Sequence, residues 1–195
     1  MRLALSAITL VTLLAVSCNN EPKQTASTTT TTTATPPVPR KPASALNEKG
    51  TSDLTSLLAA YYELKDAMVA TDTSKADIAA SHVLSAAETM KNTLNADSAH
   101  TALLPHIDNI LKNSDAINAD KQSDIEKKRA SFEKISDAMY ALLKDAKMSN
   151  AGVYHQYCPM AFNDKGAYWL SNEEEIKNPY FGKKMLECGE VKDSL

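Results

Sequence analysis

The sequence predicts a mainly α-helical protein: an antiparallel four-helix bundle followed by a small C-terminal appendage that contains short β-strands. Between residues 52 and 148, apolar side chains recur at steps of three and four residues, which is the period of helices packed in a bundle. After residue 148 this pattern stops. Residues 149–195 hold most of the aromatic residues, the only tryptophan and nearly all of the glycines, so we expect a compact appendage packed on the bundle as part of one domain.

The N-terminus has the pattern of a secretory signal peptide. Arg2 precedes an apolar run from Leu3 to Val16, which is shorter than the roughly 20 residues that span a bilayer. Residues 15–18, Ala-Val-Ser-Cys, resemble the bacterial lipoprotein cleavage box, in which the cysteine becomes the lipidated first residue. We therefore expect residues 1–18 to be a lipoprotein signal peptide and Cys18 to carry a lipid anchor. The alternative is an ordinary secretory signal that is cut nearby.

Residues 19–51 are dominated by threonine, proline, alanine and lysine. Such a segment cannot bury enough apolar surface to offset its chain entropy, so we expect a disordered tether. Together with the signal peptide, it predicts a protein held at a membrane in the cell envelope, facing the periplasm, at the outer membrane rather than the inner one.

Four stretches of the chain carry a helical stripe. Ser52 is available to cap the first, and Ser74 with Asp77 resembles a capping box at the start of the second. Pro105 lies inside the third, so that helix either starts near Ala102 or is kinked. The four stretches are residues 52–70, 73–94, 97–117 and 120–147.

Charge and motifs exclude several classes of function. The formal net charge is −3 and the isoelectric point about 5.8, which gives no footprint for nucleic acid. The basic residues within 126–134 alternate with acids, which is typical of a solvated helix face. The sequence contains no nucleophile elbow, phosphate loop or zinc-protease helix, so we do not expect an enzyme.

The appendage reads as short extended pieces separated by turns. Residues 153–162 alternate as in a strand, which would place Cys158, Met160 and Phe162 on one face. Residues 167–171 are a possible second strand, and residues 171–178 look like a helical turn. Residues 185–191 form either a third extended piece or a tight turn.

Two cysteines remain after lipidation, Cys158 and Cys188, and each has a methionine nearby, Met160 and Met185. Cu(I) prefers soft thiolate and thioether ligands and accepts imidazole, so these four residues could bind one Cu(I), with His155 as a substitute ligand. In an oxidising compartment two cysteines also pair readily, and a Cys158–Cys188 disulfide would remove the thiolates. Metal site, structural disulfide and free buried thiols all remain open.

Residues 158–191 resemble the C-terminal end of a bacterial domain family of unknown function; their sequence is CPMAFNDKGAYWLSNEEEIKNPYFGKKMLECGEV. Members of that family occur as secreted lipoproteins and as the C-terminal domain of periplasmic adaptor subunits of heavy-metal (copper or silver) efflux pumps. The four preceding helices fit the family's layout, so the resemblance covers residues 52–193. It implies a connection with copper or another heavy metal.

Two function classes follow from these observations. The first is a periplasmic or cell-envelope lipoprotein that binds copper or a similar soft heavy metal and is associated with metal efflux or homeostasis. Its partners would be the membrane, through the lipid anchor, and components of an efflux pump. The second is a protein-interaction module without metal, in which Cys158 and Cys188 form a structural disulfide.

Overall fold

The computed structural model describes residues 41–120 and 122–195. The predicted signal peptide, Cys18 and most of the predicted tether lie outside these residues. The elements are, in chain order, α1 (Glu48–Ala70), α2 (Thr73–Asn95), the 3₁₀ helix η1 (Ser98–Leu103), α3 (Leu104–Ala119), α4 (Ile125–Asp145), β1 (Tyr154–Cys158), α5 (Ala161–Asp164), β2 (Ala167–Ser171), the 3₁₀ helix η2 (Gly182–Lys184) and β3 (Glu190–Ser194).

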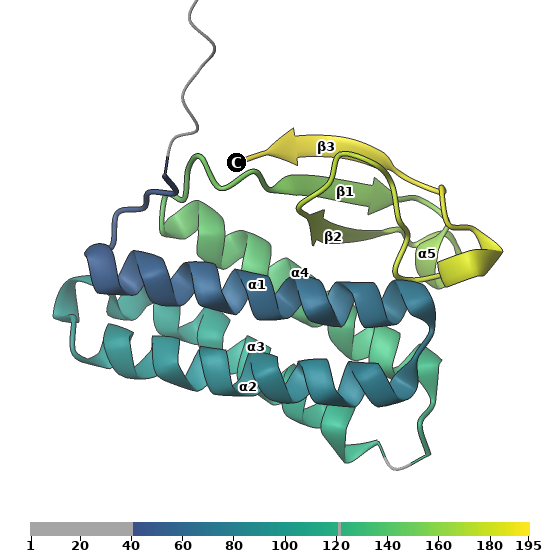
Figure 1. Cartoon of the computed structure of the whole chain (residues 1–195), viewed down its shortest axis with the longest axis horizontal. Helices are drawn as coiled ribbons and strands as arrows, with labels where there is room; N and C mark the ends of the chain where they lie inside the picture. The colour runs from purple at the N-terminus through teal and green to yellow at the C-terminus, as the bar shows by residue number, and fades with distance from the viewer. Residues whose placement is uncertain (1–40, 121) are drawn as a thin grey trace, which may run out of the picture. The chain divides into compact units, whose positions relative to one another are not determined.

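Successive long helices pack against one another, α1 on α2, α2 on α3 and α3 on α4 (Figure 1). The predicted apolar stripes form the core between them: Leu54, Met90, Ile110 and Ile135 are all fully buried. The prediction of a mainly helical protein with a small C-terminal β-structure is therefore confirmed, and the packing is compatible with the predicted antiparallel bundle. Within the described part of the chain, no helix combines the length and the apolarity needed to cross a bilayer.

The folded region starts earlier than the sequence predicted. Helix α1 begins at Glu48, where the Asn47 side chain accepts a hydrogen bond from the Gly50 N–H (2.8 Å), and Ser52 is not its cap. Upstream, the backbones of Ala43 and Ser149 exchange two hydrogen bonds (3.0 and 2.8 Å). Residues 43–51 are thus part of the fold, and the prediction of a tether up to residue 51 is wrong for them.

The next two helix starts also have local causes. Asp72 caps α2 by accepting from the Lys75 N–H (3.0 Å), so the predicted capping box at Ser74 is not used. Helix α3 begins at Leu104, two residues after the predicted start. Pro105 lies in its first turn, where the missing N–H costs nothing, so it begins the helix rather than kinking it.

Two basic residues on α4 are buried, contrary to the predicted solvated face. The Lys128 ammonium donates to the Ile117 carbonyl (2.7 Å) and to the Asp77 carboxylate (2.5 Å). Arg129 is only 3% exposed. A buried cation is tolerated when it is paired and hydrogen-bonded, and both side chains meet that condition. These two residues link α4 to its neighbours, whereas the alternating charges predicted that their side chains would be exposed to solvent.

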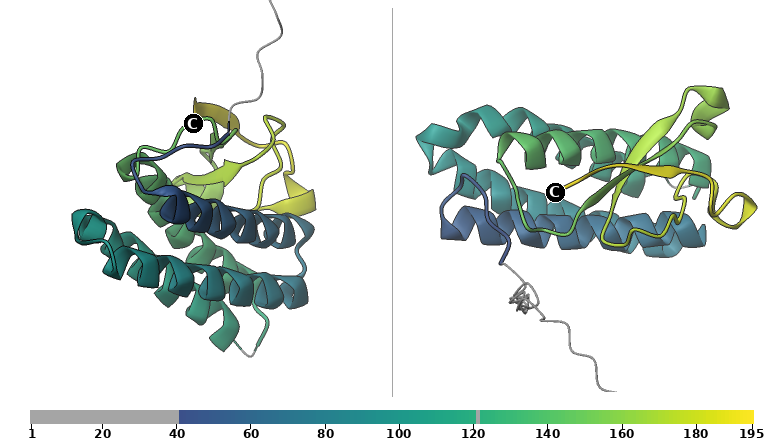
Figure 2. Two further views of the ribbon diagram at one scale, coloured as in Figure 1. Left: turned by 60° about the vertical axis from the view of Figure 1, so that its left-hand side comes forward. Right: turned by 90° about the horizontal axis from the view of Figure 1, so that it is seen from above.

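The C-terminal residues form a three-stranded antiparallel sheet in the order β2-β1-β3. Strand β2 contacts α4 and α1, and seen from above the strands run across these two helices (Figure 2). The predicted strand over residues 167–171 is confirmed as β2. The closing segment contains both predicted alternatives, a turn at Met185–Cys188 and then strand β3.

Aromatic side chains join the sheet to the helices. The Tyr61 ring of α1 stacks on Phe132 of α4, with ring centroids 5.3 Å apart. Tyr180 contacts Phe132 on one side and Trp169 of β2 on another, at centroid distances of 5.9 and 6.0 Å. The Tyr61 hydroxyl also accepts a hydrogen bond from the Leu170 N–H (3.0 Å). The appendage therefore shares one core with the helices.

Two predictions of local structure in the appendage are wrong. The strand that begins at residue 154 ends at Cys158 rather than near residue 162, because Met160 has helical dihedral angles and Phe162 a positive φ. Residues 172–175 form bends and residues 176–177 have no regular structure, so the predicted helical turn does not form. The fully buried Gln156 amide donates to the backbone carbonyls of residues 173–175 (2.9, 3.0 and 3.4 Å), which takes these acceptors away from a helix.

Candidate functional site

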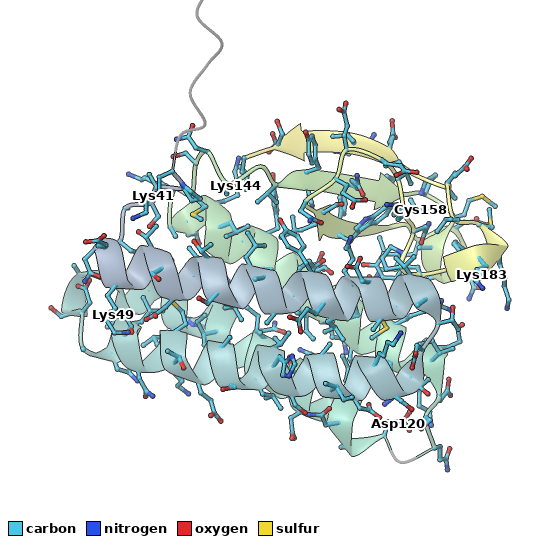
Figure 3. All side chains as sticks on the ribbon, viewed as in Figure 1. Lys41, Lys49, Asp120, Lys144, Cys158 and Lys183 are labelled. Atoms are coloured by element: carbon cyan, nitrogen blue, oxygen red, sulfur yellow. The ribbon has the colours of Figure 1, made fainter. Side chains whose placement is uncertain are left out.

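The structure brings the two cysteines of the appendage together. Cys158 is the last residue of β1, the central strand, and is fully buried. Cys188 lies between η2 and β3 and is partly exposed. Their Sγ atoms are 2.7 Å apart. Figure 3 shows Cys158 toward the end of the fold that carries Lys183 and away from Lys41.

Two neighbours fix the backbone at Cys188. The buried Asn178 side chain donates to the Cys188 carbonyl (2.7 Å) and accepts from the N–H groups of Tyr180 and Phe181 (2.8 and 3.2 Å). Gly189 follows with a φ of 153°, and a Cβ there would lie 2.8 Å from Cη2 of Trp169. Any larger residue would push this segment off the sheet, so glycine next to Cys188 is required by packing.

The Cys188 thiol is protonated at neutral pH. Burial raises its pKa to about 11, and the adjacent Cys158 thiol acts in the same direction. The backbone N–H of Met160 hydrogen-bonds to Cys188 and partly offsets the increase. A metal that binds here must displace this proton, so binding depends on pH.

The two predicted methionine ligands lie on the segments that carry the cysteines. Met160 is 45% exposed and begins the turn after Cys158. Since β1 has ended, strand alternation no longer aligns Met160 with Cys158, and the backbone hydrogen bond to Cys188 places Met160 beside the pair instead. Met185 forms a turn with Cys188, whose N–H donates to the Met185 carbonyl (3.2 Å). That turn is the geometry in which Met185 and Cys188 can share a site.

His155 lies away from the sulfur pair. It occupies the opposite face of β1, and its ring stacks between Tyr140 of α4 and Tyr168 of β2, at centroid distances of 3.7 and 4.6 Å. Burial lowers its pKa to about 4, although the Asp193 carboxylate acts in the opposite direction. The role of substitute ligand predicted for His155 needed a bend toward Cys158 that the structure does not have.

The stacked His155 gives stability a specific dependence on pH. As the pH falls from about 6.5 to 4, the unfolded chain takes up a proton at this histidine and the folded chain does not, so the free energy of unfolding falls. We expect a loss of up to about 3 kcal/mol across this window. Urea denaturation at several pH values measures it. His155→Phe keeps the ring stack and should flatten the slope, and an unchanged slope in that variant would disprove this origin.

The arrangement can do two kinds of chemistry. Reduced, it offers two thiols, with thioether side chains on the adjoining turns at Met160 and Met185, which is a soft donor set. Oxidised, it can form a disulfide without rearrangement, because the sulfurs already touch. Among the described residues, no group of three or more histidine, cysteine, aspartate or glutamate side chains could hold a metal ion, so a metal here would depend on the methionines.

Sequence reasoning missed the residues that support the pair. Asn178 and Gly189 were both within the segment that suggested the family, but only the fold shows what each contacts. The Asn-Pro step at residues 178–179 was the one available signal, because it is typical of a side-chain-stabilised turn.

Among the comparisons with known proteins, a match was found only for the helical part of the chain. No curated protein and no solved structure matches it. One family model matches residues 57–151, which contain most of α1, all of α2, α3 and α4, and none of the sheet. The sulfur pair is therefore outside the matched residues. The predicted resemblance to a family of unknown function is confirmed: residues 57–151 match the family model described as "Protein of unknown function (DUF3347)".

Proposed function

We propose that the protein is a lipid-anchored protein of the cell envelope that binds Cu(I), or a similar soft metal ion, and serves metal efflux or homeostasis. The observation that carries the proposal is the contact between the Cys158 and Cys188 sulfurs, 2.7 Å apart, with Met160 and Met185 on the adjoining turns. The helices, as an antiparallel four-helix bundle, would be the scaffold on which this site is built.

The donor set favours Cu(I). Two thiolates supply negative charge, and thioethers are soft neutral ligands that discriminate against hard cations. A metal bound to both sulfurs holds each at about 2.3 Å, so the two Sγ atoms must move apart on binding. Cys158 is held in the central strand, whereas Cys188 lies outside any helix or strand next to exposed residues 186–187. We expect Cys188 to make this movement.

The link to efflux rests on the family resemblance of the C-terminal segment. The location in the envelope rests on the sequence before residue 41. Lipidation has its own test: Cys18→Ser should move the protein from the membrane fraction to the soluble fraction. If this variant still sediments with membranes after a salt wash, the protein is not anchored through Cys18.

Competition for Cu(I) against a chelator, without oxygen and with the protein reduced, tests metal binding. Every variant carries Cys18→Ser so that Cys158 and Cys188 are the only thiols. We expect Cys158→Ser and Cys188→Ser each to abolish tight binding, and Met160→Leu to weaken it without loss of helical structure. Met148→Leu, at a buried methionine that precedes the sheet, and His155→Phe should both bind like the parent. If parent and Cys158→Ser compete equally poorly, there is no metal site.

That last outcome would favour a second candidate function. The contact distance between the sulfurs and the complete burial of Cys158 also suit a structural disulfide. A bridge across the 30 residues that separate the two cysteines would contribute about 3–4 kcal/mol by the chain-entropy estimate. The protein would then be an interaction module. Both cysteine variants should lose similar stability under oxidising conditions, and Met160→Leu should have little effect.

A further inference from the structure

We infer that the reduced Cys158–Cys188 pair is also a reductant for cupric ion, delivering two electrons to two Cu(II) ions as it closes to a disulfide. The inference rests on the soft-metal chemistry of the proposed function, and it adds an activity to it. It starts from the same contact, because two sulfurs 2.7 Å apart need no search through the chain to form their bond.

Access to the pair is asymmetric. Cys158 is fully buried in the central strand of the sheet, whereas Cys188 is partly exposed and Met160 is 45% exposed. An incoming ion therefore meets Cys188 first, with the thioether residue Met185 in the same turn. Thiolate and thioether ligands stabilise Cu(I) over Cu(II), so contact with these two residues makes the copper easier to reduce.

The electrons and protons balance over two steps. Cys188 loses its proton to water and gives one electron to the first Cu(II), which leaves Cu(I) and a sulfur radical. That radical bonds to the adjacent Cys158 sulfur as Cys158 loses its proton. The resulting disulfide radical anion gives its electron to the second Cu(II). The net reaction converts two thiols and two Cu(II) into one disulfide, two Cu(I) and two protons, once per reduced protein.

The geometry separates this reaction from the slow oxidation of an ordinary thiol. With a single cysteine, the sulfur radical must find a second protein molecule, so the reaction becomes second order in protein and yields one Cu(I) per chain and a disulfide-linked dimer. Because Cys158 is fully buried, the dimer is hardest to form in Cys188→Ser, where Cys158 is the remaining thiol. The pair avoids this encounter altogether.

The test mixes the reduced protein, carrying Cys18→Ser, with two equivalents of Cu(II) in the absence of oxygen. The Cu(II) electron paramagnetic resonance signal, the thiol count and the protein mass are followed. We expect the signal to disappear with first-order dependence on protein, both thiols to be lost, and a monomer lighter by two hydrogen atoms. Cys158→Ser and Cys188→Ser should react more than tenfold more slowly and yield dimers.

Each outcome of this experiment either supports or overturns the reduction of Cu(II) by the cysteine pair. Persistence of the Cu(II) signal with both thiols intact overturns the inference, even if the Cu(I) competition shows tight binding. Equal rates in the parent and the single-cysteine variants overturn it as well. Rapid reduction with an intramolecular disulfide supports it, even if the reduced protein fails to retain Cu(I), in which case only the proposed binding function falls. Protein loaded beforehand with one Cu(I) should react more slowly if both proposals hold.

Discussion

Arg129→Met should lower the free energy of unfolding by about 3 kcal/mol. The Arg129 guanidinium of α4 donates to the Pro179 carbonyl (2.8 Å) in the appendage and to the Met68 carbonyl (3.2 Å) and Thr71 hydroxyl (3.1 Å) at the end of α1. It also pairs with Glu126 (2.8 Å). Methionine preserves length and helix propensity, but it leaves the Pro179 carbonyl without this donor, while the Met68 carbonyl keeps the Thr71 N–H.

The effect should be strongest in the appendage. Pro179 follows Asn178, whose side chain holds the Cys188 carbonyl, so loss of Arg129 also loosens the sulfur pair. Urea denaturation gives the global change, and hydrogen exchange at the sheet amides gives the local one. Lys127→Met, two positions earlier on an exposed part of the same helix, should stay within about 0.5 kcal/mol of the parent. Equal losses in the two variants would show that Arg129 is not a structural link.

Arg129 also shows where sequence reasoning about the fold stops. The helices could be predicted because a stripe such as Leu57, Leu64 and Met68 has a period that only a helix buries on one side. A charged residue has no such signature, because burial of its charge depends on acceptors that come from distant parts of the chain. For Arg129 these are 61 and 50 positions away, at Met68 and Pro179.

For the candidate site, too, some features could be predicted from the sequence and others only from the fold. Cys158 and Cys188 could be identified as candidates because sulfur is a soft ligand and the sequence predicts an oxidising compartment. Their contact could not be predicted, because it depends on the strand order β2-β1-β3 and on the Asn178 turn. His155 could be excluded only by the fold, because its place on the opposite face follows from β1 being straight up to Cys158. Alternation predicted that relation for a strand and failed only where the strand ended, before Met160.

Ile135→Asp should unfold the protein. Ile135 is fully buried in the middle of α4, on the stripe that also contains Phe132 and Met139, and neither of these apolar neighbours can pair with a carboxylate. The substitution deletes a large apolar side chain and buries an unpaired charge, which together cost more than about 4 kcal/mol, a large part of the 5–15 kcal/mol typical of a domain.

The matched control lies at the preceding position. Lys134 is exposed and has no ion pair among the described residues, so Lys134→Asp introduces the same side chain into the same helix without burying it. It should change stability by less than about 1 kcal/mol, mostly through helix propensity. Far-UV circular dichroism at 25 °C should show a folded Lys134→Asp and an unfolded Ile135→Asp. A folded Ile135→Asp with the parent's melting temperature would mean that α4 does not pack through this face. The aromatic contacts from Phe132 to Tyr180 that join the sheet to the helices would then need another explanation, because they depend on the same orientation of α4.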